Sequence, residues 1–325
     1  HKTDVSTVIA REWYDNDDVD VIIGLGNSAV ALAVQQLTRE KNKIDIVVAA
    51  SASSITGEQC SPNGFQWVHD TYNIAASTAR ALVNEGDKNW FFITVDYAFG
   101  KALKADAAKV VEQTGGEVLG EVQHPFATPD LSSFLLQAKD SGADVIGLAN
   151  AGVDTVNSLK QAREFGIGLD GKQRLAALLF LVTDVHGAGL DIAQDLAVTL
   201  PFYWDMNDES RAFSKRWQAE MNRPPTMYHA GTYSAVTHYL KAVAAAGTDD
   251  TDAVLAKMRE IPVNDMMTKD GKIRADGHVM RDFYVYQVKK PEESTGEWDV
   301  FKRLSTISAE DAAVPVSASA CDLLK

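Results

Sequence analysis

A glycine-rich turn is the first segment whose residue types could bind a ligand. Residues 24–29 read Gly-Leu-Gly-Asn-Ser-Ala, after an apolar stretch and before apolar residues at helical spacing. This matches the G-x-G-x-x-A pattern of dinucleotide sites, which also need an acid about 20 residues on for the ribose hydroxyl. The next strand ends instead in Ala49-Ala50-Ser51. We therefore expect no nucleotide cofactor, and interpret Asn27 and Ser28 as a helix start whose N–H groups attract an anion.

A second small, hydroxyl-rich loop follows at Ala50-Ser51-Ala52-Ser53-Ser54. Small side chains let a ligand approach the backbone, and serine hydroxyls can bind a carboxylate. The structural alternative is an ordinary serine-rich loop. Two such loops at adjacent strand ends favour a ligand site, because ligands of parallel sheets bind at the carboxyl ends of the strands.

Two aromatic residues, Tyr97 and Phe99, follow a third apolar strand in the segment Val95–Gly100. Core packing explains one such aromatic, but two around a strand–helix turn suit a flat apolar ligand. Catalytic patterns are missing: there is no G-x-S-x-G, H-E-x-x-H or Walker loop, and the 7 histidines are scattered. We expect neither an enzyme nor a metal site.

Composition narrows the possible partners. The chain has 325 residues, enough for two lobes, and a net charge of −14. Such a surface repels nucleic acid and anionic membranes and favours a monomer. The longest apolar run, Leu175–Val182, falls short of the roughly 18 residues that span a bilayer. The chain begins at His1 without an apolar leader, as a processed secreted protein or a truncated one would. Cys60 and Cys321 are either two buried thiols or one disulfide of an oxidising compartment.

Apolar strands alternate with helical stretches through the first two thirds of the chain, which predicts parallel sheets covered by helices. The predicted strands are 19–24, 44–50, 65–69, 90–95, 117–123, 143–149, 175–181 and 196–202. The predicted helices among them are 5–14, 28–40, 74–84, 100–114, 131–140, 154–165 and 185–195. Longer helices then cover 209–221, 228–245 and 252–260, before strands at 283–289 and 298–304. Because the chain opens on a helix, we expect that a first strand–helix unit is missing.

Several segments together resemble the type I periplasmic binding proteins of ABC importers, in the branched-chain amino-acid group and its branch associated with aromatic acids. The segments are Ile9–Asp15, Asn27–Val34, Cys60–Asn63, Asp96–Gly100, Ala143–Gly152, Gly231–Val243 and Met280–Pro291. The resemblance implies an α/β fold of two Rossmann-like lobes hinged by three crossings. Lobe one is then 1–70 with 205–281, and lobe two is 71–204 with 282–304. The tail 305–325 returns to lobe one, held by a Cys60–Cys321 disulfide.

The resemblance also implies a function and a set of ligand residues. The protein is expected to be periplasmic, to catch a small molecule between its lobes and to present the closed form to membrane permease subunits. The implied ligand residues are Asn27, Ser28, Ser51, Ala52, Ser53, Tyr72, Tyr97, Phe99, Asn150, Ala151, Gly152, Phe180 and Tyr228. For Phe180, core packing is an equal alternative.

The ligand itself is expected to be a small carboxylate, aromatic rather than an α-amino acid, with a keto or branched aliphatic acid fitting nearly as well. Amino-acid binders of the family hold the ammonium with acidic side chains of lobe two, but residues 179–181 and 72–74 are uncharged here, and Asp70 is the only acid nearby. Two other functions stay open: a branched-chain amino-acid or amide binder, and an intracellular ligand-sensing regulator of the same fold.

Overall fold

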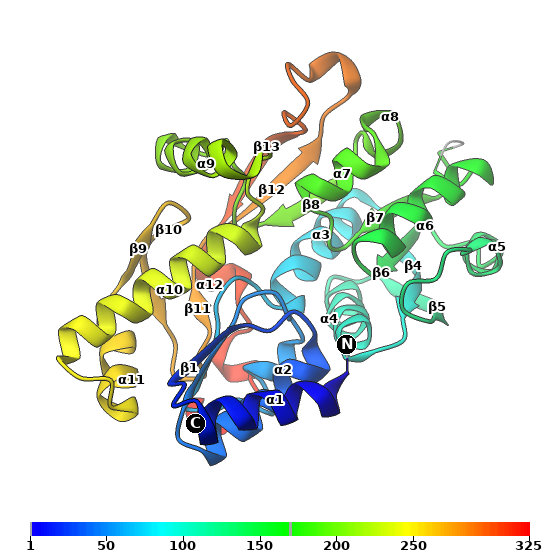
Figure 1. The fold of residues 1–325 in the computed structure, drawn as a ribbon. Coiled ribbons are helices and arrows are strands. Elements are labelled where there is room, and N and C mark those ends of the chain that lie inside the picture. The colour runs from blue at the N-terminus through cyan, green and yellow to red at the C-terminus, as the bar shows by residue number, and fades with distance from the viewer. Residues whose placement is uncertain (1, 169–170) are drawn as a thin grey trace. The chain divides into compact units, whose positions relative to one another are not determined.

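The computed structural model describes residues 2–168 and 171–325, which form two compact units (Figure 1). Unit 1 comprises His1–Asp70, Pro201–Asp282 and Ser308–Lys325. Unit 2 comprises Thr71–Leu200 and Phe283–Ile307. Each unit contains a parallel β-sheet with helices packed on it, which confirms the predicted α/β fold class.

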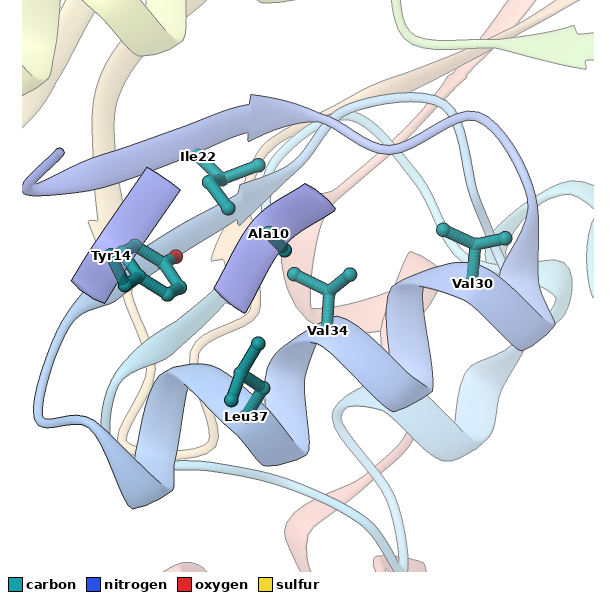
Figure 2. Packing of buried hydrophobic residues seen from close by; sticks show 6 residues of the cluster. All are labelled: Ala10, Tyr14, Ile22, Val30, Val34 and Leu37. Carbon is teal, nitrogen blue, oxygen red and sulfur yellow. The ribbon is translucent and has the colours of Figure 1, made fainter. Parts of the chain in front are cut away.

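The first sheet of unit 1 is parallel, with order β1-β2-β3. Its strands are β1 (Val21–Gly24), β2 (Ile44–Val47) and β3 (Gly64–Gln66). Two helices, α1 (Thr3–Asn16) and α2 (Ser28–Glu40), pack together beside it. Figure 2 shows why: apolar side chains at helical spacing on both helices meet a side chain of β1. The cluster is Ala10, Tyr14, Ile22, Val30, Val34 and Leu37.

The remainder of unit 1 is helical, except for one small antiparallel sheet. The helices are α9 (Asp208–Met221), α10 (Met227–Ala246), α11 (Thr251–Glu260) and α12 (Ala309–Ala312). Asn207, Thr226 and Asp250 begin the first three with side-chain caps, which fixes where each helix starts. The small sheet has the order β11-β10-β9, from β9 (Val263–Asp265), β10 (Thr268–Ile273) and β11 (Val279–Met280).

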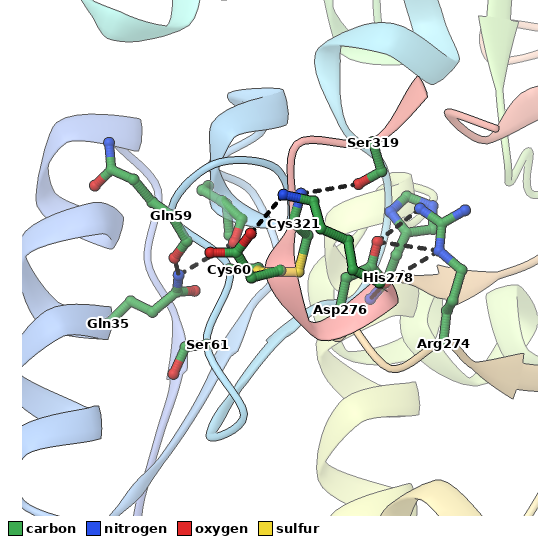
Figure 3. Close-up of a disulfide and its surroundings, with 12 residues drawn as sticks. Gln35, Gln59, Cys60, Ser61, Arg274, Asp276, His278, Ser319 and Cys321 are labelled. Atoms are coloured by element: carbon green, nitrogen blue, oxygen red, sulfur yellow. Dashed lines mark hydrogen bonds and ion pairs between the residues drawn. A yellow bond between two sulfur atoms is a disulfide. The ribbon is translucent and has the colours of Figure 1, made fainter. Parts of the chain in front are cut away.

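The C-terminal tail is fastened to unit 1 (Figure 3). Cys60 and Cys321 form a disulfide, as predicted, across a sequence separation of 261 residues. Arg274 donates to the carbonyl oxygen of Val314 at 2.8 Å and pairs with the buried Asp276. The irregular tail is therefore tied to unit 1 by a covalent bond and by the hydrogen bond from Arg274, whose guanidinium the ion pair with Asp276 holds in position. Short 3₁₀ helices cover Ser53–Ile55, Pro291–Glu293, Val316–Ala318 and Asp322–Leu324.

Unit 2 is built on a parallel sheet with order β5-β4-β6-β7. Its strands are β4 (Asn89–Val95), β5 (Glu117–His124), β6 (Val145–Ala149) and β7 (Arg174–Ala177). The main helices are α3 (Thr71–Glu85), α4 (Ala98–Gln113), α5 (Ser132–Asp140) and α6 (Val153–Glu164). A second, antiparallel sheet has the order β13-β12-β8, from β8 (Ala197–Leu200), β12 (Phe283–Val288) and β13 (Phe301–Ile307).

Four sequence-based expectations need correction. The strand predicted over 175–181 ends at Ala177, so Phe180 lies beyond it. The helix predicted over 185–195 is two helices, α7 (Val182–Ala188) and α8 (Leu190–Ala193), because Gly189 has a φ of 94° that no helix allows. The strand predicted at 298–304 lies at 301–307, and the sheet β9–β11 was not predicted. Within the described part of the chain, no helix is long and apolar enough to cross a membrane.

Candidate functional site

The first two candidate loops, which follow β1 and β2, lie together at the carboxyl edge of the unit 1 sheet. Gly24 and Leu25 both have positive φ, 122° and 54°, so the chain turns sharply at the end of β1 and enters α2. The Ser28 hydroxyl then accepts hydrogen bonds from the backbone N–H groups of Ser51 and Ala52, at 3.3 and 3.2 Å. Asn27 caps α2 by accepting from the N–H of Val30 at 3.1 Å. Ser28 thus holds the two loops together.

Ser51 is the polar group of this edge that the fold itself leaves unused. Its side chain is only 1% exposed, and Oγ has no hydrogen-bond partner among the described residues. Ala52 beside it is buried, and Ser53 begins a short 3₁₀ helix. Because a buried hydroxyl without a partner costs free energy, one that is retained needs an explanation. A ligand oxygen beside the N-terminus of α2 would supply one.

Tyr228, at the start of α10, is tied to His69 of the same unit. The two side chains meet at 3.2 Å between His69 Nε2 and the tyrosine hydroxyl. His69 Nδ1 lies 3.4 Å from the carbonyl oxygen of Asp70, which can only accept, so Nδ1 carries the proton. Burial lowers the pKa of His69 to about 4, which keeps the ring neutral and leaves Nε2 as the acceptor. The Tyr228 hydroxyl therefore donates its hydrogen bond to His69 and offers a ligand only its oxygen lone pairs.

The carboxyl edge of the unit 2 sheet is aromatic. Tyr97 precedes α4, and its ring centroid lies 5.8 Å from those of both Phe99 and Phe126. Gly100 makes this turn possible, because a Cβ there would lie 2.1 Å from the carbonyl oxygen of Val95. The pKa of Tyr97 is raised to about 12, first by burial and second by the nearby carboxylate of Asp154. Its phenol accordingly stays protonated and can act as a hydrogen-bond donor.

The loop after β6 has two parts with different roles. The Asn150 side chain is fully buried and already bonded: Oδ1 accepts from Thr155 at 2.8 Å, and Nδ2 lies within reach of His124 and Ser158. It can serve a ligand only through its backbone. Ala151 and Gly152 are half-buried, and Gly152 has a φ of 60° before α6 begins. This turn suits close approach of a ligand to the backbone.

Two further predicted residues are enclosed in the protein. Tyr72 lies in the first turn of α3 and is 7% exposed. Phe180, beyond the end of β7, is fully buried. A ring with no exposed surface contributes to the core, and it touches a ligand only if neighbouring side chains move.

Sequence reasoning missed two residues on the unit 2 edge. Phe126, in the loop after β5, is 51% exposed and packs edge-on against Tyr97. Asp154, in the first turn of α6, is 1% exposed; its Oδ2 accepts from the N–H of Ala127 at 3.1 Å, whereas Oδ1 has no partner among the described residues. Their positions just after strands β5 and β6 were the signal that could have found them. In the described ranges no group of three or more metal-binding side chains comes together.

Comparison with known proteins identifies the family of the chain. A family model described as "Periplasmic binding protein" matches residues 1–296. A periplasmic binding protein of Burkholderia mallei is 45% identical over 100% of this chain and 86% of its own, with a TM-score of 0.97. A branched-chain amino acid ABC transporter periplasmic ligand-binding protein of Burkholderia xenovorans is 40% identical, with the same coverage and a TM-score of 0.88.

More distant relatives carry ligand names. A "Leu/Ile/Val-binding protein homolog 6" of Brucella melitensis is 24% identical over 89% of this chain and 75% of its own length. A solute-binding protein of an ABC transporter from R. palustris, solved in complex with benzoate, is 22% identical over 99% of this chain and 86% of its own, with a TM-score of 0.84. That likeness shows a shared fold.

Proposed function

Because the chain belongs to the periplasmic binding protein family, we propose that it is the extracytoplasmic solute-binding component of an ABC importer. In this role it captures a small organic carboxylate with an aromatic ring and delivers it to the membrane permease subunits. Members of the family are solute-binding proteins rather than enzymes, and the proposal assigns no catalytic step to any residue.

The observation that carries the ligand proposal is a division of chemistry between two strand edges. In unit 1, the buried Ser51 hydroxyl, unused by the fold, stands beside the N-terminus of α2 and suits a carboxylate. In unit 2, Tyr97 and Phe99 present aromatic rings, which suit a flat apolar body. The hydroxyl group thus suits the oxygens of an aromatic carboxylate, and the aromatic rings suit its ring. The benzoate-bound R. palustris protein supports this choice of ligand class.

A second candidate ligand, an α-amino acid, is favoured by one observation. A bound ammonium needs a buried anionic partner, since leaving it unpaired costs several kcal/mol. Asp154 has a buried oxygen, Oδ1, without a partner in the described part of the chain, and it acts electrostatically on Tyr97. Residues 179–181 carry no acid to pair with an ammonium, but Asp154, two residues after Gly152, would supply one. The names of the Burkholderia xenovorans and Brucella melitensis relatives agree with this alternative.

A thermal-shift panel separates the two candidates. Benzoates, phenylacetates, aliphatic 2-keto acids and leucine are each added to the purified protein, where a ligand at 100 times its Kd stabilises by roughly 2.7 kcal/mol. We expect stabilisation by benzoates or phenylacetates and none by leucine. The Asp154→Asn variant should then keep its response to benzoate. Stabilisation by leucine alone, abolished in Asp154→Asn, would replace the aromatic acid with the amino acid.

A further inference from the structure

Phe126 is an aromatic side chain that the fold leaves partly exposed. It follows β5, whose last residue His124 is in register with Val95, the last residue of β4. The ring is 51% exposed, although Phe is a residue that folding normally buries. It packs at 5.8 Å between ring centroids and an interplanar angle of 87° against Tyr97, which lies between the end of β4 and the start of α4. Phe126 and Tyr97 therefore form one aromatic surface across two adjacent strand ends.

A second exposed apolar side chain follows the other neighbouring strand, β6. Val153, the first residue of α6 after β6, is 57% exposed. Since β4 lies between β5 and β6 in the sheet, Phe126 and Val153 belong to the loops on either side of the one that carries Tyr97. Together the three residues make an apolar edge surface, with an aromatic residue at its centre.

This surface is held in a fixed conformation by hydrogen bonds. Asp154, next to Val153, accepts from the N–H of Ala127, next to Phe126, so one bond links the two segments that carry the exposed side chains. Ala127 has a φ of 58°, a conformation that costs about 1 kcal/mol or more for a residue with a Cβ. Gln161 of α6 donates to Pro129 and accepts from Leu131, at 2.9 and 2.7 Å, and thus ties down the rest of the loop. A strained and anchored loop with an exposed ring at its tip is typical of a binding surface.

We infer that Phe126 is a specificity-determining residue of the ligand site, and that with Val153 it selects an aromatic ring over a branched aliphatic group. The inference rests on the proposed function and names residues of the same site that it did not include. An aromatic ligand ring gains an edge-to-face contact with Phe126, worth more than the burial of an equal aliphatic area. An aliphatic ligand gains only the burial.

The test compares three substitutions in the full chain. Phe126→Ala removes the ring, Phe126→Leu keeps an apolar side chain without the ring, and Leu119→Ala removes a 42% exposed side chain of β5 away from the carboxyl edge. Affinities for benzoate, 3-methyl-2-oxobutanoate and leucine are measured by isothermal titration. We expect Phe126→Ala to weaken benzoate binding about three- to tenfold and Phe126→Leu nearly as much, with less than about twofold change for 3-methyl-2-oxobutanoate. Leu119→Ala should leave all affinities unchanged.

Each result decides the inference. Unchanged benzoate affinity in Phe126→Ala, while Tyr97→Ala loses it, would overturn the role of Phe126 and leave the proposed function standing. Equal losses for benzoate and for the aliphatic acid would overturn the selectivity. If the wild-type protein binds none of the three compounds, the proposed function fails, and this inference fails with it. Unaltered melting temperatures of the ligand-free variants would show that the losses concern binding and not folding.

Discussion

The two parallel sheets end in opposite kinds of surface. At the carboxyl edge of unit 1 the side chains are small, and hydroxyl-to-backbone bonds such as Ser28 to Ser51 hold the loops together. At the same edge of unit 2, aromatic rings at Tyr97, Phe99 and Phe126 take that place. The comparison teaches that one supersecondary unit, the strand–turn–helix, ends either in small hydroxyl-bearing residues or in aromatic rings, depending on the few residues between strand and helix.

The largest expected difference between the units concerns stability. Only unit 1 contains the Cys60–Cys321 disulfide, which closes a loop with a sequence separation of 261 residues. The loop-entropy account gives such a crosslink roughly 5 kcal/mol. Reduction should therefore lower the free energy of unfolding of unit 1 by about that amount and leave unit 2 nearly unchanged. Hydrogen-exchange mass spectrometry with and without reductant measures both units at once.

The matched control is the Cys60→Ser/Cys321→Ser double variant, which should not respond to reductant. Equal loss of amide protection in both units would mean that the disulfide stabilises the whole chain, and the contrast between the units would then be lost.

A buried acid gives unit 1 an alkaline sensitivity that unit 2 lacks. Burial raises the pKa of Asp45, on β2, from 3.8 to about 8. The folded protein then keeps a proton that the unfolded chain releases above pH 4, so stability falls as the pH rises toward 8. Burial raises the pKa of Asp184, in unit 2, to about 6, so this group no longer changes the stability once the pH is well above 6. Between pH 6.5 and 8 the wild type should lose about 2 kcal/mol of its free energy of unfolding through this group. The Asp45→Asn variant lacks the group and should not show this loss.

Urea denaturation at the two pH values measures this gain, and Asp184→Asn is the control. The control variant should follow the wild-type slope. An Asp45→Asn protein whose stability falls between pH 6.5 and 8 as steeply as the wild type would show that Asp45 is already ionised in the fold.

The Tyr97→Ala variant tests whether unit 2 contacts the aromatic ring of the ligand. The side chain lies at a strand end and contacts two other rings that remain in the variant. Losing this aromatic contact should cost about 1–3 kcal/mol of binding, or one to two decades in Kd for benzoate, with the protein still folded. Titration calorimetry gives the affinity and circular dichroism checks the fold. An unchanged Kd would place Tyr97 outside the ligand site.

The smallest expected effect separates two serines of unit 1. Ser51→Ala removes a hydroxyl that has no partner in the described residues, so stability should hold while carboxylate affinity falls about tenfold. Ser28→Ala removes the acceptor of two buried N–H groups and should destabilise the fold by about 1–3 kcal/mol. Melting curves and benzoate titrations of both variants are compared. Destabilisation by Ser51→Ala without loss of affinity would reverse the two roles.

Sequence periodicity predicted most of the fold for a physical reason. Buried parallel strands such as 145–149 are continuously apolar, and helices such as 28–40 carry apolar residues every third or fourth position. The sheet β9–β11 was missed because it is short and mostly polar, with exposed residues such as Lys269 and Asp270. The break at Gly189 was missed because a single glycine within a helical pattern does not by itself indicate positive φ.

The candidate site was predictable only in part. Strand ends followed by small or aromatic residues pointed to Ser51 and Tyr97, since that rule needs no knowledge of the partners. By contrast, the burial of the Asn150 side chain against His124 and the contact of a neutral His69 with Tyr228 depend on residues that are distant in sequence. No spacing rule reports such contacts.

The central claim is that the protein binds an aromatic carboxylate rather than an α-amino acid. The most direct measurement is isothermal titration of the wild-type protein with benzoate and with leucine under identical conditions. We predict saturable 1:1 binding of benzoate and no heat of binding for leucine. Tight leucine binding without any response to benzoate would contradict the account, and would identify Asp154 as the partner of a ligand ammonium.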